Sequence, residues 1–218
     1  MNRSGKREED IKNDSKKKIE GLIEIQRAKI LKKASRKKET LRQILIEMKR
    51  KDQLKRLLIY FEDNDQISEY EDIFNDLSIF PVKLGSEKSE EERNLILDKF
   101  SKGDIDIILA MKILDEGVNV PSVERAILVS SSGNPAQFIQ RRGRLLRKFE
   151  GKTKSEIHDI IINIEDPYGL NGLSYIEKAI VSKELRRAMM FGQTAKNYTE
   201  CMKVINEILL KYQIRDIL

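Results

Sequence analysis

The run RLLIYFEDNDQISEYEDIF, at residues 56–74, sets the pattern on which the predicted fold depends. Its first seven residues form an apolar run of the kind found in strands that are covered on both faces of a sheet. Asn64 or Asp65 is suited to cap a helix behind this strand. Apolar residues then recur at helical spacing, at Ile67, Tyr70, Ile73, Phe74 and Leu77. A strand followed directly by an amphipathic helix is the first half of a βαβ unit.

The same alternation of strands and helices continues along the chain. IFPVKL (79–84) is a second short strand, which Pro81 should place at an edge or start late. SEEERNLILDKF (89–100) is a helix with acidic residues in its first turn, where the helix dipole favours them. Three more strand-type runs follow, DIDIILAM (104–111), ERAILVSS (124–131) and EIHDIIINI (156–164). The sequence therefore predicts an α/β fold, with a mostly parallel sheet covered by helices and ligands at the carboxyl ends of its strands.

The two flanks of this region have a helical pattern. Residues 1–18 contain almost no apolar side chain and should be disordered or marginally helical. Apolar residues at helical spacing between positions 19 and 48 predict two helices. YIEKAIVSKELRRAMMF (175–191) and CMKVINEILLKY (201–212) predict a helical tail. We expect a basic helical extension at 1–55, the sheet domain at 56–168 and a C-terminal helical extension at 169–218.

The positive charge is concentrated near the start of the chain. The formal net charge is +6, but residues 1–56 hold 20 Lys and Arg against 9 Asp and Glu, a net +11. The remainder holds 22 against 27, a net −5. Such a segment suits a polyanion such as nucleic acid, because each neutralised phosphate releases condensed counterions. A solvated helical surface explains the same composition equally well.

Composition also narrows the class of protein. Cys201 is the single cysteine, so an intramolecular disulfide and a cysteine-cluster zinc site are excluded and a reducing compartment is expected. No apolar run approaches the ~20 residues that span a bilayer. Charged residues make up 36% of the chain and hydrophobic residues 39%, a balance within reach of a folded domain. We expect a globular, cytoplasmic protein without a membrane segment.

The run SSSGNPAQFIQRRGRLLRKFEG, at residues 130–151, carries the candidate chemistry. Asn134 and Pro135 are suited to begin a helix. On that helix Gln140, Arg144 and Arg147 fall on one face, with Gly143 beside the first arginine. Guanidinium groups suit phosphoryl transfer, since their planar donors stay charged and bind phosphate oxygens in pairs. By composition alone, a basic helix on the protein surface explains the same pattern.

The spelling Q-x-x-G-R-x-x-R in this run resembles the sixth motif of superfamily-two helicases, which lies in their second RecA-like domain. Upstream, EGVNVP (116–121) resembles the core of the fifth motif, and LLIYFED (57–63) resembles the fourth-motif strand. Between them, a G…R…F…G signature runs through Gly85, Arg93, Phe100 and Gly103. The resemblance covers about residues 57–164 and is nearest to the bacterial restriction-type and repair-type translocases. It implies a RecA-like sheet.

The resemblance also implies roles for individual residues. Arg144 and Arg147 would be arginine finger and γ-phosphate sensor, and Gln140 would organise the catalytic site. Contacts to the nucleotide would come from Glu116, Gly117, Asn119 and Gly143. Contacts to nucleic acid would come from Gly85, Ser86, Lys112 and Ser131. No metal ligand is implied in this chain. The family commonly has Thr where Ala110 stands and Asp where Asn119 stands, so one phosphate hydroxyl and one acidic contact are in doubt.

The other half of an ATP site is missing from the sequence pattern. The only Gly-Lys-Thr, at 151–153, has Leu146 where a phosphate-binding loop requires glycine, and no D-E-x-H motif occurs. ATP with Mg²⁺ would then bind mainly to a first RecA-like domain, supplied in cis or in trans. The implied function is the second motor domain of an ATP-dependent DNA helicase or translocase, inactive as an ATPase alone. A free-standing nucleic-acid-binding or regulatory module is the alternative, and an RNA helicase is less favoured.

Three further side-chain groups are better explained by structure than by chemistry. His158 should be an ordinary strand residue, because no second ligand or nucleophile pairs with it. Cys201 should pack in a helix, because it has no partner cysteine. The acidic run at 90–92 is explained by the helix dipole.

Overall fold

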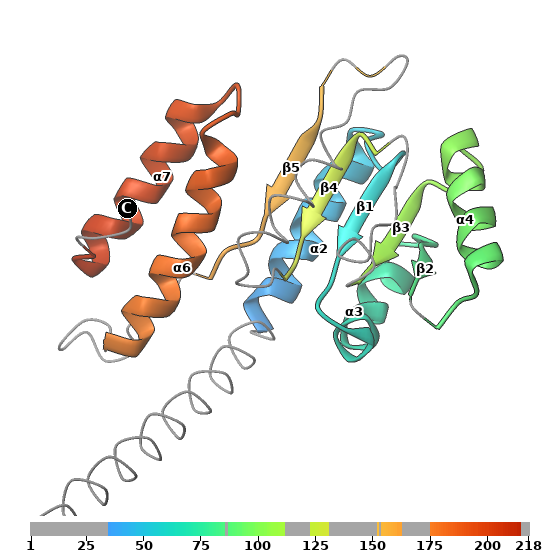
Figure 1. Ribbon diagram of the computed structural model, residues 1–218, viewed down its shortest axis with the longest axis horizontal. Coiled ribbons are helices and arrows are strands. Elements are labelled where there is room, and N and C mark those ends of the chain that lie inside the picture. Colours follow the sequence, from blue (N-terminus) through green and yellow to red (C-terminus); the bar gives the residue numbers. More distant parts are fainter. Residues whose placement is uncertain are drawn as a thin grey trace, which may run out of the picture.

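The computed structural model describes residues 35–85, 87–111, 123–130, 152, 154–162 and 175–214 (Figure 1). The strands are β1 (Leu57–Tyr60), β2 (Val82–Leu84), β3 (Ile107–Ala110), β4 (Arg125–Leu128) and β5 (Glu156–Asp159). The helices are α2 (Ser35–Arg50), α3 (Asn64–Asp76), α4 (Glu90–Lys102), α6 (Tyr175–Gly192) and α7 (Tyr198–Tyr212). All five strands were predicted from their apolar runs, and these five helices from their helical spacing. α2 is the second of the two helices predicted between positions 19 and 48, and the first lies outside the described residues.

The strands form one parallel sheet in the order β2-β3-β1-β4-β5. β1 is the central strand, and Leu57 stands in register with Ile107 of β3 and Arg125 of β4. All four residues of β1 and of β3 are buried, as expected for strands covered on both faces. β2 begins directly after Pro81 and is an edge strand, which confirms the expectation drawn from that proline.

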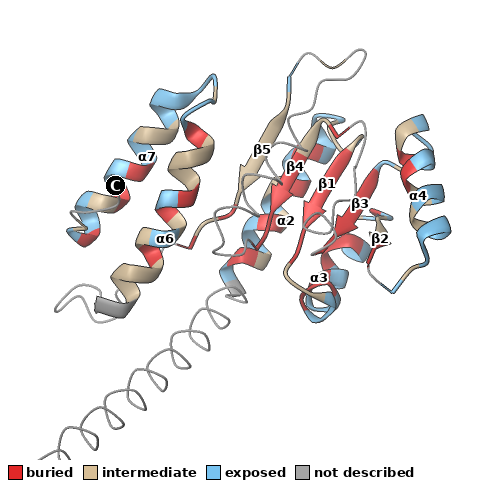
Figure 2. Cartoon of the chain, viewed as in Figure 1, coloured by how far each residue is buried: buried red, intermediate tan, exposed pale blue. Residues whose placement is uncertain are grey.

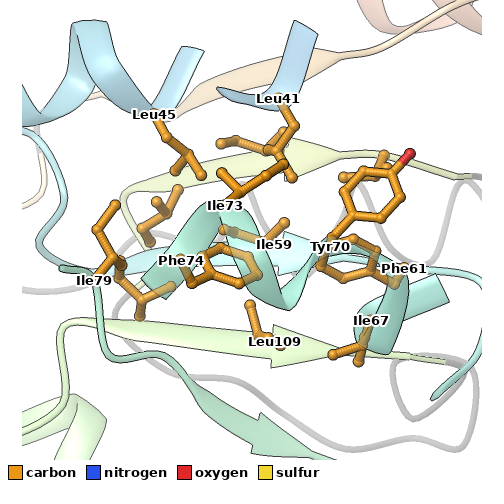
Figure 3. Packing of buried hydrophobic residues seen from close by; sticks show 14 of the residues in the cluster. Leu41, Leu45, Ile59, Phe61, Ile67, Tyr70, Ile73, Phe74, Ile79 and Leu109 are labelled. Atoms are coloured by element: carbon orange, nitrogen blue, oxygen red, sulfur yellow. The ribbon is translucent and has the colours of Figure 1, made fainter. Parts of the chain in front are cut away.

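Helices cover both faces of the sheet. α2 and α3 pack on one face, against the alternate strand residues that include Ile59, Leu109 and Ile127. Figure 3 shows how closely side chains of the two helices meet above β1. α4 packs on the opposite face through Leu97 and Phe100. The sheet therefore has apolar cores on its two sides, as Figure 2 shows by burial.

α2 belongs to the main core, although it lies in a strongly basic stretch of sequence. Leu41 and Leu45 are fully buried in the cluster that α2 and α3 form against the sheet. The polar side of the helix is tied to α3, where Lys38 pairs with Asp72 at 2.8 Å and Arg42 pairs with Asp76. The lysines and arginines of this helix thus surround an apolar stripe that packs like any other core helix.

The starts of α3 and α4 are set by side-chain caps. Asp63 accepts a hydrogen bond from the backbone N–H of Gln66 at 2.8 Å, so the cap stands one residue before the positions expected from the sequence. Ser89 and Glu92 form a reciprocal capping box at the start of α4. Gly103 ends α4 with φ at 88°, in the left-handed region that glycine adopts without strain.

α6 and α7 lie side by side next to β5 and share a small core of their own (Figure 1). This core is formed by the buried side chains Val181, Leu185, Ile205, Ile208 and Tyr212. The tail was predicted to be helical, and both helices confirm it. Cys201 is half-buried in α7, and His158 is a residue of β5, as expected. Across the described ranges, no helix combines the length and apolar character needed to cross a membrane.

The packing of α2 predicts a large difference between two neighbouring substitutions. Leu45→Ala should lower the free energy of unfolding by about 2–5 kcal/mol, because it leaves a cavity in the main core. Ile46→Ala, on the exposed side of the same helix, should cost less than about 1 kcal/mol. Urea unfolding of both variants measures the difference. Equal effects would mean that α2 does not pack on the sheet.

The buried hydroxyl of Tyr70 predicts that the stability of the fold falls at high pH. It is buried without a hydrogen-bond partner among the described residues, and burial, with the charge of Glu69, raises the pKa of Tyr70 to about 12. The unfolded chain loses this proton near pH 10. Stability should therefore be unaffected by Tyr70 below pH 10 and should fall as the pH rises from 10 to 12.

Tyr70→Phe should remove the loss of stability between pH 10 and pH 12. It should also raise the free energy of unfolding near pH 7 by about 1 kcal/mol, because it deletes a buried hydroxyl without a hydrogen-bond partner. Tyr198→Phe, at an exposed ring, should change neither quantity. Urea unfolding at pH 7 and pH 11 makes the comparison. A Tyr70→Phe variant that keeps the wild-type loss at pH 11 would refute this assignment.

Candidate functional site at the carboxyl edge of the sheet

The ends of β3, β1 and β4 lie beside one another at the carboxyl edge of the sheet. The N–H of Phe61 donates to the carbonyl of Ala110 at 2.9 Å, and the N–H of Val129 donates to the carbonyl of Tyr60 at 3.0 Å. The chain continues from β3 into residues 112–122, which hold the EGVNVP run, and from β4 into the Q-x-x-G-R-x-x-R run. The two motif-bearing segments thus leave the sheet on either side of the end of β1.

Gly85 is the one predicted site residue within the described part of the chain. It is buried just after β2, and a Cβ atom there would come within 1.9 Å of the Glu87 carboxylate. That carboxylate is the end of a flexible side chain, so the space around Gly85 can be widened at small cost. Ala110, where the family commonly has Thr, is fully buried among apolar residues.

The remaining predicted site residues lie outside the described residues. They are Ser86, Lys112, Glu116, Gly117, Asn119, Ser131, Gln140, Gly143, Arg144 and Arg147. The structure describes the strand ends from which their segments start, and no geometry of the residues themselves. Their roles stay predictions.

Gln66 connects two strand ends at this edge. The backbone N–H of Glu62 donates to Gln66 Oε1 at 2.9 Å, and Gln66 Nε2 donates to Ser130 Oγ at 2.9 Å. Gln66 is fully buried and Ser130 is 1% exposed. The side chain therefore links Glu62, two residues after β1, to Ser130, two residues after β4. Both hydrogen bonds are buried, so losing either would leave a polar group without a partner.

Lys37 is a second buried polar residue at the same edge. Its Nζ donates to the carbonyl of Val129 at 2.8 Å, and the residue is 4% exposed. The roles of Lys37 and Gln66 were not predicted from the sequence, because each contact joins elements far apart in the chain. The spacing did contain a signal for the burial of Lys37. It stands four residues before Leu41 and eight before Leu45, on the apolar stripe of α2.

A buried ion cluster lies where β5 meets the tail. Arg187 of α6 donates from Nη2 and Nε to the two carboxylate oxygens of Asp159, at 2.9 and 3.1 Å. Its Nη1 donates to Glu184 at 2.7 Å. Burial raises the pKa of the Asp159 carboxyl, although the guanidinium opposes that shift. Burial acts against the charged form of Arg187, but the two carboxylates outweigh it and raise the pKa of the guanidinium.

These described polar groups bind one another and the backbone, which suits them to fix strand ends. Within the described ranges, no three His, Cys, Asp or Glu side chains gather as a metal site would require. Arg144 and Arg147, the arginines predicted to bind phosphate, lie in the run that follows β4, outside the described residues. The described residues form the frame from which that run starts.

A five-stranded parallel sheet with helices on both faces and motif segments at its carboxyl edge is the RecA-like architecture of helicase motor domains. The C-terminal domain of the DEAD-box protein Dbp5 has this fold and superposes with a TM-score of 0.53 at 16% identity, over 80% of this chain and 92% of that one.

The family follows from the sequence match. The model of the helicase conserved C-terminal domain matches residues 36–149, more than half of the chain. The chain belongs to this family, among the superfamily-two helicases.

Two characterised relatives match short parts of the chain. The DNA 3'-5' translocase XPB2 of Sulfurisphaera tokodaii is 46% identical over 59 residues, which are 27% of this chain and 13% of that protein. The pre-mRNA-processing ATP-dependent RNA helicase PRP5 of Kluyveromyces lactis is 32% identical over 72 residues, which are 33% of this chain and 9% of that protein. The chain thus corresponds to a small part of each relative.

The ion cluster at β5 predicts a strong effect of one substitution on stability. Arg187→Met should lower the free energy of unfolding by about 3–5 kcal/mol, because it leaves the carboxylates of Asp159 and Glu184 buried together without their cation. Lys183→Met, on the exposed side of α6, should change it by less than about 0.5 kcal/mol. Chemical unfolding of the two variants tests this. A loss below 1 kcal/mol for Arg187→Met would contradict the buried cluster.

Proposed function

We propose that this chain is the second motor domain of an ATP-dependent DNA helicase or translocase and supplies Arg144 and Arg147 to ATP bound on a first RecA-like domain. One observation carries the proposal. The family match extends through the Q-x-x-G-R-x-x-R run, and the described strand order starts that run and the EGVNVP run from the same edge of the sheet. This arrangement supports a shared role for both runs at an interface between motor domains.

The proposed chemistry depends on charge. During phosphoryl transfer negative charge spreads over the phosphate oxygens, and a guanidinium group at that point accelerates the reaction by about 10³–10⁵-fold. Arg144 and Arg147 would neutralise that charge, and Gln140 would orient the site. The donor groups offered by this chain suit phosphate oxygens and not a metal ion, so ATP and its Mg²⁺ would be held mainly by the first domain.

The nucleic acid on which the motor is proposed to act is DNA. The match at 46% identity to a protein described as a DNA translocase supports DNA. Gly85 and Ser86 at the end of β2, with Lys112 after β3 and Ser131 after β4, would contact the phosphate backbone. The basic first 56 residues would add a salt-dependent attraction.

The net +11 charge of residues 1–56 favours a second candidate function. A free-standing module could use this segment to bind nucleic acid with no catalysis. The two candidates differ in whether nucleotide turnover depends on the arginines. They also differ in whether a first motor domain changes the behaviour of the chain.

ATP hydrolysis tests the proposal directly. The purified chain should show turnover near background. Addition or fusion of a first RecA-like domain with a phosphate-binding loop should produce DNA-stimulated turnover, and Arg144→Ala or Arg147→Ala should lower kcat about 10³-fold in that assembly. Phosphate release measured with and without duplex DNA, single-stranded DNA and RNA provides the readout.

Arg186→Ala is the matched control, because it removes an exposed arginine of α6, outside the basic first 56 residues, and should leave kcat unchanged. Robust turnover by the isolated chain would refute the division of the site between two domains. Wild-type kcat in the Arg144→Ala assembly would refute the arginine-finger assignment. Salt-dependent nucleic-acid binding without any turnover in the assembly would favour the binding module.

A further inference from the structure

We propose that Lys37 and Gln66 are positioning residues that hold the carboxyl end of β4, from which the segment with Gln140, Arg144 and Arg147 leaves the sheet. The inference rests on the proposed function for its catalytic consequence. Its structural part concerns described residues alone. Neither residue lies in a motif that the sequence analysis singled out.

The two side chains hold consecutive residues of the chain from two different helices. Lys37 of α2 binds the carbonyl of Val129, and Gln66 of α3 binds the hydroxyl of Ser130. The other end of the Gln66 amide accepts from the N–H of Glu62, just after β1. The end of β4 is therefore restrained by backbone pairing to β1 and by two buried side-chain contacts.

The burial of Lys37 is difficult to explain by packing. A methionine would fill the same stripe position above Leu41 without the cost of removing an ammonium group from water. The charge of Lys37 interacts with the Asp159 carboxylate, which compensates part of that cost. A methionine would lack both this interaction and the hydrogen bond to the carbonyl of Val129, and of the two the hydrogen bond is the one that acts on the end of β4.

Accurate placement of the strand end matters because arginine fingers act by geometry. A displacement of about 1 Å at a reacting group can cost roughly a hundredfold in rate, even when its cause lies far from the chemistry. A loosened end of β4 should therefore lower kcat and leave KM for ATP nearly unchanged, since ATP would be held mainly by the first domain.

Hydrogen exchange of the complete chain tests the structural part. Lys37→Met and Gln66→Leu should speed exchange severalfold in peptides that contain Val129 and Ser130. Lys183→Met and Gln43→Leu are matched controls, because Lys183 is exposed on α6 and Gln43 is exposed on α2, where it contacts Glu39. Thermal melts should show all four variants folded. Exchange at the end of β4 that is equal in the variants and their controls would overturn the proposal.

Kinetics of the chain assembled with a first motor domain test the catalytic part. Lys37→Met and Gln66→Leu should lower kcat roughly tenfold or more, with KM for ATP changed less than about twofold. The two controls should keep wild-type values. A kcat within twofold of the controls would overturn the positioning role. If Arg144→Ala still abolishes turnover in that case, the proposed function stands and this inference alone fails.

Discussion

The parallel register of β3, β1 and β4 is the constraint on which the rest of the molecule depends. Leu57, Ile107 and Arg125 stand side by side, and three residues later the three strands end together. Neighbouring strands lie about 4.8 Å apart. The segments that follow β3 and β4 therefore start only about 10 Å from each other, with the end of β1 between them. A one-residue slip would move the apolar side chains of a strand to the opposite face, so the buried cores on both faces hold the register.

Both helical flanks reach the same edge of this sheet. Lys37 of α2 donates a hydrogen bond to the carbonyl of Val129, just after β4. Arg187 of α6 donates hydrogen bonds to Asp159 at the end of β5. Each contact buries a cation, which is costly unless a partner compensates it. The flanks are thus joined to the sheet by directional contacts as well as by apolar packing. A contact of this kind specifies one geometry, whereas apolar surfaces tolerate several.

Most of the fold could be predicted from the sequence because it depends on local patterns. Continuous apolar runs marked the strands, Pro81 marked the edge strand, and helical spacing marked α2, α3, α4, α6 and α7. The contacts of Lys37 and Gln66 could not be predicted in this way. Their partners lie 92 and 64 residues away, and no local pattern encodes such pairs. The motif residues differ in that they were assigned from the sequence, by resemblance to the family. Of those assigned to the site, only Gly85 lies in the described structure.

The position of α6 and α7 relative to β5 is fixed by a charged contact and not by apolar packing alone. The buried apolar side chains of α6 and α7 pack against each other. Ile161, just after β5, is partly buried against this cluster, and Phe191 of α6 is partly buried against the cluster of α4. Packing of that kind would allow the helix pair to slide along β5.

The paired hydrogen bonds of Arg187 to both oxygens of Asp159 remove this freedom, because a planar guanidinium fits a carboxylate in one orientation. Glu184, one turn earlier on α6, fixes the guanidinium from the helix side. The orientation of the tail is therefore set at the carboxyl end of β5, beside the strand end from which the arginine-bearing run leaves the sheet.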